Sequence, residues 1–508
     1  MSNSKKKEII EMKKYFILAS MAFALSLSSC KDYLDINYDP TLPTDEALTP
    51  GQILPAVEMN LASSYGDYLR IVGGYLSEQY AQRFGTGNYL DYSKFEVKPS
   101  STGTLAYQQI YQRVISTGNT ALKKAEETND HGTFLAVTVL RAYAFAAMVD
   151  CYDSIPYKEA AADIKQPKYD DGRTVYDGII AEIDNALAKV SSSDVVATNF
   201  LFPGQKADNW IRFANALKLK LYTRLSNIDE SVLPKIAELI ESPLPTSDVA
   251  FKGCWASSAG AENPFYAGEF GSNFSIQFNV VANATVIETM KNSGDKRIGA
   301  FFTQNDKGDY LGGVSGTQFS TFAGIYGSAS FSRPVMTYDA PLSLLTLMEI
   351  EFYKAEYYAR KGDAANAKSH YESAIRQSFK SAGVDGADDN IAYYPYDQTN
   401  WKKSIGTAKY LALSGIDNFE AWCELRRLRY PAFNVQVAGT DICNEATKTY
   451  SPDKYVPGTL YTPIGVSSYI GANALAERFP HPTESSNANN NCPVNFDGVY
   501  KLPVFWAK

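Results

Sequence analysis

The stretch from residue 342 to 382 limits the fold more than any other part of this chain, because two helical patterns meet there at a single turn. Apolar residues recur with helical spacing over 342–362 and again over 363–382, and Gly362-Asp363 at the junction is a typical turn sequence. Two helices joined by so short a connection must lie antiparallel and in contact. The sequence therefore predicts a helix–turn–helix here.

Small and aromatic residues alternate along this segment, a pattern typical of a tetratricopeptide-like unit, in which small side chains let two helices approach closely. The small residues are Ala355, Ala359, Ala367 and Ala374, and the aromatic ones are Tyr353, Tyr358 and Tyr371. A chance helical hairpin is the alternative. Further helical patterns cover residues 51–64, 71–84, 105–127, 133–151, 174–190 and 209–226. We therefore expect a mainly all-α fold built as a tetratricopeptide-like helical repeat body.

The helical periodicity is interrupted between residues 241 and 340. Glycine, serine, asparagine and aromatic residues become more frequent there, and only 280–291 keeps a helical pattern. A loop-rich insert of this length inside a helical protein is more often functional than filler. We expect one domain over 50–508, with helical halves at 50–240 and 341–508 on either side of this aromatic-rich, loop-rich insert.

The N-terminal region has the pattern of a secretion signal that ends in a lipobox. Lys13 and Lys14 precede an apolar run over 15–27, which is too short to cross a bilayer as a mature helix. Leucine and two serines then stand immediately before Cys30, and lipoprotein signal peptidases require small residues at these places. An ordinary secretory signal with an incidental cysteine is the alternative.

The lipobox gives a specific expectation for processing. We expect Met12 to be the initiator, residues 1–29 to be a signal peptide, Cys30 to carry the lipid, and residues 30–49 to form an extended tether. No second apolar run is long enough to span a bilayer, so the acyl chains are the only membrane anchor that we expect.

The charge balance argues against nucleic acid as a partner. Five lysines and two glutamates in the first 29 residues carry a net charge of +3, so the net charge of −8 becomes about −11 once they are removed. An acidic protein gains nothing from a phosphate backbone.

Residues suited to catalysis are scarce. The chain has only three histidines, His131, His370 and His481. None has the spacing of a zinc site or a catalytic triad, and no Cys-x-x-Cys pair is present. Glu349, Glu351 and Glu356 crowd one predicted helix, and we interpret them as a solvated face rather than a glycosidase pair. We therefore expect no enzymatic activity, no metal and no cofactor.

The cysteines beyond Cys30 are five in number, so at least one thiol is free. Cys151 and Cys423 fall in apolar helical patterns and are expected to be small core residues. A disulfide between Cys443 and Cys492 is possible in an oxidising compartment, and the sequence does not decide it.

Aromatic residues outside helical periodicity mark the candidate ligand site. An aromatic ring packs on the C–H face of a sugar, while arginine and amide side chains pair with its hydroxyl groups. One glycine-broken loop holds Arg83, Asn88, Tyr89 and Tyr92. The insert supplies Trp255, Tyr266, Tyr310 and Tyr326. The alternative is that such rings fill a small core under the loops.

Four further segments resemble the SusD/RagB family of nutrient-binding outer-membrane lipoproteins. They are an Arg-Ala-Tyr helix running into Ile-Pro-Tyr over 141–157, an Asn-Ala-Leu helix over 210–226, the signature Glu-x-Trp-x-Glu-x-Arg-Arg over 420–427, and Arg-Phe-Pro-His-Pro over 478–482. In the last segment His481 stands where that family more commonly has tyrosine. With the lipobox and the hairpin, the resemblance covers essentially the whole mature chain.

The resemblance implies a non-catalytic, lipid-anchored protein at the outer membrane of a Gram-negative bacterium, facing the cell surface. It implies that the protein binds a nutrient, expected to be an oligosaccharide, and delivers it to a SusC-like TonB-dependent transporter. A peptide receptor of the same family, a secreted glycan hydrolase and a purely structural scaffold for the transporter are the alternatives. The family's ligand residues form no transferable motif, so the eight candidate residues rest on composition alone.

Overall fold

The computed structural model describes residues 48–508 except 84–86, 101, 161, 163, 198, 272–278, 318–330, 445 and 448. The predicted signal peptide, the lipidation site Cys30, nearly all of the tether and the candidate residue Tyr326 lie outside the described residues. Helices make up most of the described part, which confirms the prediction of a mainly all-α fold.

Helix α7 (His131–Tyr152) lies at the centre of the first half of the body. The Asp130 carboxylate caps it by accepting a hydrogen bond from the Thr133 N–H at 2.9 Å. The helix is long and apolar enough to cross a membrane, but 94% of its most apolar stretch is buried inside the protein. A helix that is apolar all round is here a core helix. The helices packed on it are α2 (Pro50–Ser63), α6 (Ser116–Glu127), α8 (Gly172–Lys189) and α9 (Ala207–Leu225).

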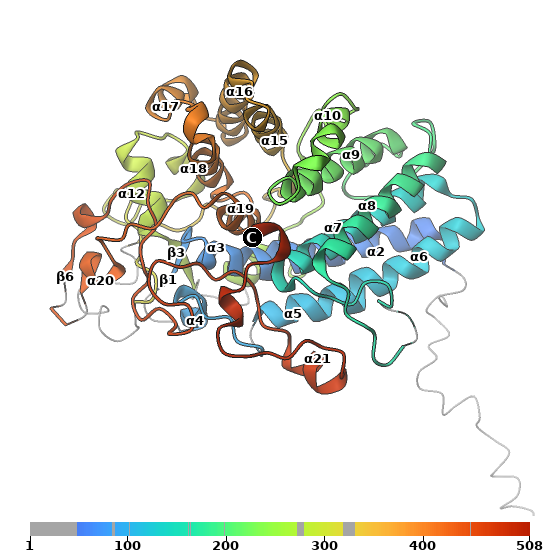
Figure 1. Ribbon diagram of the computed structural model, residues 1–508, viewed down its shortest axis with the longest axis horizontal. Coiled ribbons are helices and arrows are strands. Elements are labelled where there is room, and N and C mark those ends of the chain that lie inside the picture. The colour runs from blue at the N-terminus through green and yellow to red at the C-terminus, as the bar shows by residue number, and fades with distance from the viewer. Residues whose placement is uncertain are drawn as a thin grey trace, which may run out of the picture. The chain divides into compact units, whose positions relative to one another are not determined.

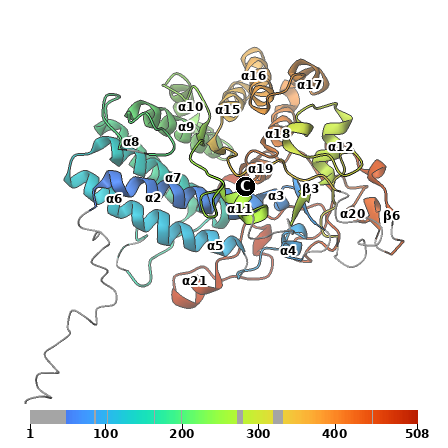
Figure 2. The ribbon, with the colours of Figure 1, turned by 180° about the vertical axis from the view of Figure 1, so that it is seen from behind.

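The helical body continues from α9 into the second half of the chain (Figure 1, Figure 2). Helix α9 contacts α10 (Leu233–Ile240) and α15 (Leu347–Arg360), and α15 contacts α16 (Ala364–Ala382) and α18 (Trp401–Leu413). Helix α18 in turn packs on α19 (Asn418–Leu428), and α19 packs on α3 (Arg70–Leu76) near the start of the described chain. Helical segments from both halves of the sequence are therefore joined in one body.

The α15–α16 pair confirms the predicted helix–turn–helix. Ala355, Ala367 and Ala374 are fully buried, as close helix packing requires. A capping box between Thr346 and Glu349 begins α15, so this helix starts five residues later than predicted.

Three short antiparallel sheets interrupt the helices in the described part of the chain, and the sequence did not predict them. They pair β1 (Tyr80–Gln82) with β3 (Val280–Ala282), β2 (Val249–Phe251) with β4 (Leu342–Leu345), and β5 (Cys443–Asn444) with β6 (Thr449–Tyr450). The predicted helices at 71–84, 280–291 and 342–362 were wrong at these strands. Segments of three or four mostly apolar residues are compatible with either conformation, and here the choice depends on a partner strand far along the chain.

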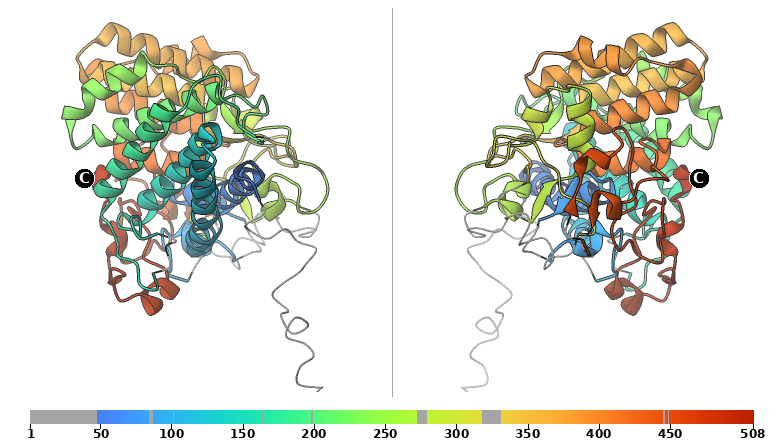
Figure 3. Two further views of the ribbon diagram at one scale, coloured as in Figure 1. Left: turned by 90° about the vertical axis from the view of Figure 1, so that its right-hand side faces the viewer. Right: turned by 90° about the vertical axis from the view of Figure 1, so that its left-hand side faces the viewer.

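The remaining elements are short. The insert contains α11 (Pro264–Glu269), α12 (Ala284–Asn292) and α13 (Ile298–Phe301). Elsewhere lie α4 (Leu90–Ser93), α5 (Thr102–Gln109), α17 (Ala387–Tyr393), α20 (Gly439–Ile442) and α21 (Thr483–Ala488). Helix α5 runs through a π-helical segment, Ile110–Ile115, into α6. In both side views of Figure 3 the dark red C-terminal segment runs from the mark C, at mid-height, to the bottom of the view, whereas the orange helices lie at the top.

A network of buried ion pairs joins α9, α15, α18 and α19. Arg427 pairs with Glu356 and with Glu424, each at 2.6 Å, and Lys220 pairs with Glu420 at 2.6 Å. Burial opposes the charge on Glu424, but Arg427 and Lys409 hold the pKa of this carboxyl well below its usual range. Helix packing here depends on paired charges as well as on apolar contacts.

The same network corrects one interpretation made from the sequence. Glu349 and Glu356 were predicted to form a solvated face, but both carboxylates are buried. Glu356 faces the cations of α19, and Glu349 belongs to the capping box of α15. Only Glu351 is partly exposed, where it pairs with His370 at 2.8 Å.

The signature over 420–427 is a structural motif. The Trp422 indole N–H donates to the Ala476 carbonyl at 2.9 Å, and the Arg426 guanidinium lies 3.4 Å from the centre of the Trp422 ring. Arg426 also donates to the carbonyls of Asp150 and Glu477. These contacts hold α19 between α7 and the C-terminal segment.

The structure tests two expectations about the cysteines. Cys151 and Cys423 are buried, as predicted. Cys492 is not in a disulfide, so the structure lacks the Cys443–Cys492 bridge that the sequence left possible.

Candidate ligand-binding site

The pairing of β1 with β3 brings the first group of candidate residues next to the insert. Beyond Gln82 at the end of β1, the Arg83 N–H donates to the Asn279 carbonyl at 2.9 Å. The chain then passes Asn88 and Tyr89 into the short helix α4. The strand pairing that sequence reasoning missed is therefore what positions this loop.

Glu269, at the end of α11, connects the loop to the insert. Its carboxylate accepts a hydrogen bond from the Tyr89 hydroxyl at 2.6 Å and from the Asn279 N–H at 3.0 Å. The Asn88 amide donates to the Asn279 side-chain oxygen at 3.3 Å. Glu269 and Asn279 were not predicted. The lone acidic residue in the aromatic run Phe265–Phe270 was the available signal for Glu269.

Tyr89 and Tyr92 have different roles in this cluster. The two rings stack, with centroids 6.0 Å apart, and Tyr75 packs 5.4 Å from Tyr89. Tyr92 is only 3% exposed, whereas Tyr89 is half-buried. Tyr92 therefore packs against the Tyr89 ring from the buried side, and it presents almost no ring surface of its own to a ligand.

Helix α11 holds Tyr266 beside this cluster. The Asn263 side chain caps the helix, and Phe265 is fully buried against Tyr80 and the Arg70 guanidinium. Fixing Phe265 inward leaves Tyr266 partly exposed, stacked on Phe270 at 6.2 Å and edge-on to Tyr338 at 6.5 Å. Among the described residues around α11, Tyr266, Phe270 and Tyr338 keep exposed ring surface.

Two carboxyl groups give the site its electrostatic character. Asp67 lies against α11, so close that a Cβ on Gly268 would meet its Oδ1 at 2.8 Å. Burial, and then the charge of Glu269, raises the pKa of Asp67 to about 7. Burial also raises the pKa of Glu269, although the hydrogen bonds from Tyr89 and Asn279 oppose that shift. A carboxyl that is partly protonated near neutral pH both donates and accepts hydrogen bonds.

The other candidates lie among different neighbours. Burial and nearby Arg333 lower the pKa of Arg83, at the edge of the cluster. Trp255 packs on Phe251 at 6.3 Å, and its buried indole N–H has no hydrogen-bond partner among the described residues. Tyr310 lies beside α13, where a Cβ on Gly299 would be 2.9 Å from its hydroxyl. The described contacts therefore join Arg83, Asn88, Tyr89 and Tyr92 through Asn279 and α11, but do not extend to Trp255 or Tyr310.

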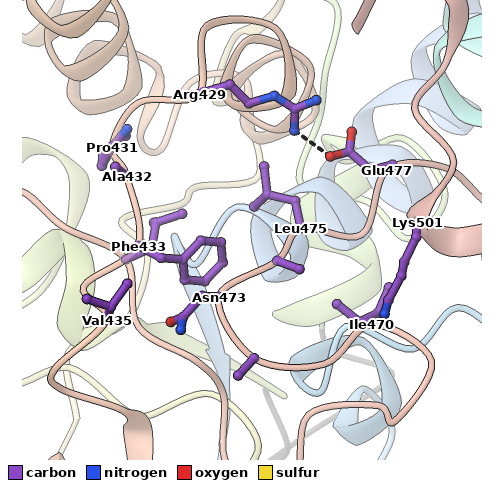
Figure 4. Close-up of a pocket in the computed structure, with 13 residues that line it drawn as sticks. Arg429, Pro431, Ala432, Phe433, Val435, Ile470, Asn473, Leu475, Glu477 and Lys501 are labelled. Carbon is purple, nitrogen blue, oxygen red and sulfur yellow. Dashed lines mark hydrogen bonds and ion pairs between the residues drawn. The ribbon is translucent and has the colours of Figure 1, made fainter. Parts of the chain in front are cut away.

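A separate hollow of about 660 Å³ lies between residues 429–435 on one side and residues 470–477 with Lys501 on the other. Figure 4 shows Arg429 paired with Glu477 on one side, and Phe433 and Val435 on another. No residue predicted as a ligand contact lines it. Within the described part of the chain, no group of three or more histidine, cysteine or acidic side chains is arranged to hold a metal ion.

A family model for SusD-like proteins, described as starch-binding and associating with the outer membrane, matches residues 43–449. The chain belongs to the SusD-like family. That description indicates a carbohydrate-binding protein that associates with the outer membrane, and it confirms the resemblance identified from the sequence motifs. A search of curated proteins gave no match.

Solved structures support the SusD-like fold. A SusD homolog from Bacteroides uniformis matches with a TM-score of 0.72 at 20% identity, covering 90% of this chain and 99% of its own. A SusD homolog from Bacteroides thetaiotaomicron matches at 0.68 and 19% identity, covering 91% and 99%. A chitin-binding protein matches at 0.69 and 17% identity, covering 87% and 94%.

Proposed function

We propose that this SusD-like protein is a non-catalytic receptor that binds an oligosaccharide and delivers it to a SusC-like TonB-dependent transporter. The binding surface is the α11 site, which we define as Asn88, Tyr89, Tyr266, Glu269 and Asn279. The observation that carries the proposal is the set of hydrogen bonds that joins Asn88, Tyr89 and Asn279 to Glu269 on α11, the helix that also holds Tyr266. The chain's family is described as starch-binding.

The chemistry of the α11 site suits a sugar. Tyr89 and Tyr266 are partly exposed rings that can cover the C–H face of a pyranose, which is apolar. Asn88 is exposed and supplies an amide group for its hydroxyls, while the buried Glu269 and Asn279 hold Tyr89 and Asn88 in position. The hydrogen bonds among these residues hold them in place before ligand arrives, which lowers the entropic cost of binding.

The anchor at Cys30 completes the proposed mechanism. A lipid on Cys30 and a tether over 30–49 would hold the receptor at the outer membrane, facing the cell surface. A tethered site of modest affinity above a transporter makes transfer effectively intramolecular, because the local ligand concentration depends on tether length rather than on bulk concentration.

Binding is tested with residues 31–508 on a glycan and peptide array, followed by calorimetry with maltohexaose and chitohexaose. We expect glycan binding, and we expect Tyr266→Ala to weaken it about tenfold, the scale of one aromatic contact of about 1.4 kcal/mol. Tyr469→Ala, which removes a ring that is 40% exposed elsewhere, is the control. Absence of glycan binding would overturn the proposal, and new reducing ends in the incubated glycans would favour a hydrolase.

A peptide receptor is the second candidate, and the hollow in Figure 4 is the observation that favours it. Phe433, Val435 and Leu475 give this hollow apolar walls, and the Arg429–Glu477 pair and Lys501 supply charges that a peptide could meet. Peptide binding on the array that Val435→Glu abolishes would support this candidate over the oligosaccharide receptor.

A further inference from the structure

A cavity of about 680 Å³ opens between α16, α17, α18 and the segments 430–433 and 457–459. Its volume lies within the range of about 300–1,000 Å³ typical of ligand pockets. Five aromatic side chains contribute to its wall: Tyr371, Tyr393, Tyr394, Tyr430 and Phe433. We call it the tyrosine cavity.

Hydrogen bonds and ring contacts fix three of these five aromatic residues. Tyr371 is fully buried, and its hydroxyl donates to the Tyr394 carbonyl at 2.7 Å, which fixes the end of α17. Tyr393 packs edge-on to Tyr394 with centroids 4.7 Å apart, and its hydroxyl accepts a hydrogen bond from the Asn292 amide of α12. Tyr393 nevertheless remains 47% exposed. An exposed ring whose position is already fixed can bind a ligand face with little loss of entropy.

Helix α18 supplies the polar side of the cavity. Lys403, Ser404 and Thr407 line it, and Thr407 lies three residues from Ser404 and four from Lys403, so it neighbours both on the helix surface. The Ser404 hydroxyl oxygen accepts the Asp397 N–H at 3.0 Å. The cavity thus has aromatic faces on one side and hydroxyl and ammonium donors on the other. Proteins recognise sugars in this way, because rings pack on the apolar C–H face and donors pair with the hydroxyl groups.

The charges around the cavity balance. Lys403 and Asp397 are the two charged residues among those that line it. The Asp397 carboxylate accepts hydrogen bonds from the Thr399 hydroxyl and from the Asn400 amide, each at 2.7 Å. One cation and one anion leave no net charge at the wall, which favours a neutral ligand over an anionic or cationic one.

The tyrosine cavity is separate from the α11 site. No residue belongs to both, and Figure 1 shows α17 and α18 at the top of the view and α4, next to the α11 site, in the lower part. Ala432 and Phe433 divide the cavity from the apolar hollow of Figure 4, which has a single aromatic residue and no tyrosine.

We propose that the tyrosine cavity is a second binding site for a neutral oligosaccharide, independent of the α11 site. The inference rests on the proposed function for its ligand class. Two separate sites on one receptor would let one glycan chain be held at two points, so that the affinity for a long chain exceeds that for a short one.

The test is calorimetry of residues 31–508 with maltohexaose, chitohexaose and xylohexaose. We expect two molecules of the hexasaccharide that binds to associate with each protein. Tyr393→Ala should reduce this number to one, as should Lys403→Glu, which keeps the ring and changes the charge. Tyr469→Ala is the matched control for loss of an exposed ring, and a melting curve for each variant shows whether it is folded.

The outcomes separate this inference from the proposed function. A stoichiometry of one that Tyr266→Ala abolishes and Tyr393→Ala does not change would overturn the second site and leave the proposed function standing. No binding of any of the three hexasaccharides would overturn both. If folded Tyr393→Ala still binds two hexasaccharide molecules, the second molecule binds outside the tyrosine cavity, which would overturn the assignment of this cavity as the second site. If the cavity instead contacts the transporter, Tyr393→Ala would reduce co-purification with the transporter without changing hexasaccharide stoichiometry, which also overturns it.

Discussion

The Tyr89 hydroxyl donates a 2.6 Å hydrogen bond to Glu269, which links two segments separated by 180 positions in the sequence. Because Glu269 also accepts from the Asn279 N–H, one carboxylate holds both the loop after β1 and the residue that precedes β3 in the insert. The relative placement of the rings of Tyr89 and Tyr266 therefore depends on this acceptor.

The hydrogen bond can be removed while the ring is kept. Tyr89→Phe should weaken oligosaccharide binding about three- to tenfold, because Glu269 loses a donor and the loop loses its link to α11. We expect a cost in the free energy of unfolding of about 1 kcal/mol. Calorimetry and urea unfolding measure the two effects, with Tyr469→Phe as the control. Equal binding by wild type and Tyr89→Phe would show that the link has no role in recognition.

Tyr89→Ala is a poorer probe of recognition than Tyr89→Phe. It removes a half-buried ring packed on Tyr75 and Tyr92, so the protein should also be destabilised, by about 2–4 kcal/mol. Loss of binding in this variant would not separate recognition from packing.

Trp255 offers a cleaner test of the insert. Its buried indole N–H has no partner among the described residues, so Trp255→Phe should leave the melting temperature within about 2 °C of wild type. If ligand accepts that N–H, affinity should fall about fivefold or more. Unchanged calorimetry would remove Trp255 from the ligand contacts.

Stability should fall as the pH rises toward 8. Burial raises the pKa of Glu78 to about 8, and one of its oxygens has no partner among the described residues. A folded-state pKa above the unfolded one means that the stabilising contribution is fully present below pH 4.5 and is lost as the pH rises through about 8. Glu78→Gln should therefore flatten the decline in melting temperature between pH 6 and 9. Burial also raises the pKa of Glu58 to about 7, so a shallower slope should remain.

The buried ion pairs should matter far more than the exposed ones. Arg427→Ala leaves Glu356 and Glu424 without their main partner and should lower the free energy of unfolding by about 3–5 kcal/mol. Lys235→Ala breaks the exposed pair with Glu238 and should cost less than about 1 kcal/mol. Urea unfolding compares the two. Similar costs would show that the network contributes little.

The proposed anchor is tested with Cys30→Ala. The variant should fold and bind oligosaccharide like wild type, but it should leave the membrane fraction and fail to incorporate labelled palmitate. Retention in the outer membrane would mean that something other than the lipid holds the protein there.

The sequence predicted the helical body well because local signals specify it. The alanine and tyrosine spacing over 353–374 predicted α15 and α16, and the apolar run over 133–151 predicted α7. The signature over 420–427 indicated the family, although its role in binding α19 to the C-terminal segment needed the structure.

Residues of the candidate site were harder to predict because distant pairings decide them. Nothing near Tyr80 in the sequence indicates that it faces Ala282, so neither β1 nor Asn279 could be placed. The sequence also does not show which side chains are buried. Tyr89 and Tyr92 lie in the same loop pattern, yet only Tyr89 keeps an exposed part in the structure. Glu356 looked like a surface charge because its partner, Arg427, lies on another helix.

The length and apolar character of helix α7 would affect how such a chain is exported from the cell interior. A 22-residue apolar segment threaded unfolded through an export channel can escape sideways into the lipid and stop there. Arg141 lies near its middle, and an arginine at that depth raises the free energy of insertion by about 2.5 kcal/mol or more. In the finished fold the same guanidinium pairs with Glu182 at 3.2 Å. One side chain would thus keep the segment moving during translocation and then find its counter-ion once the helices assemble.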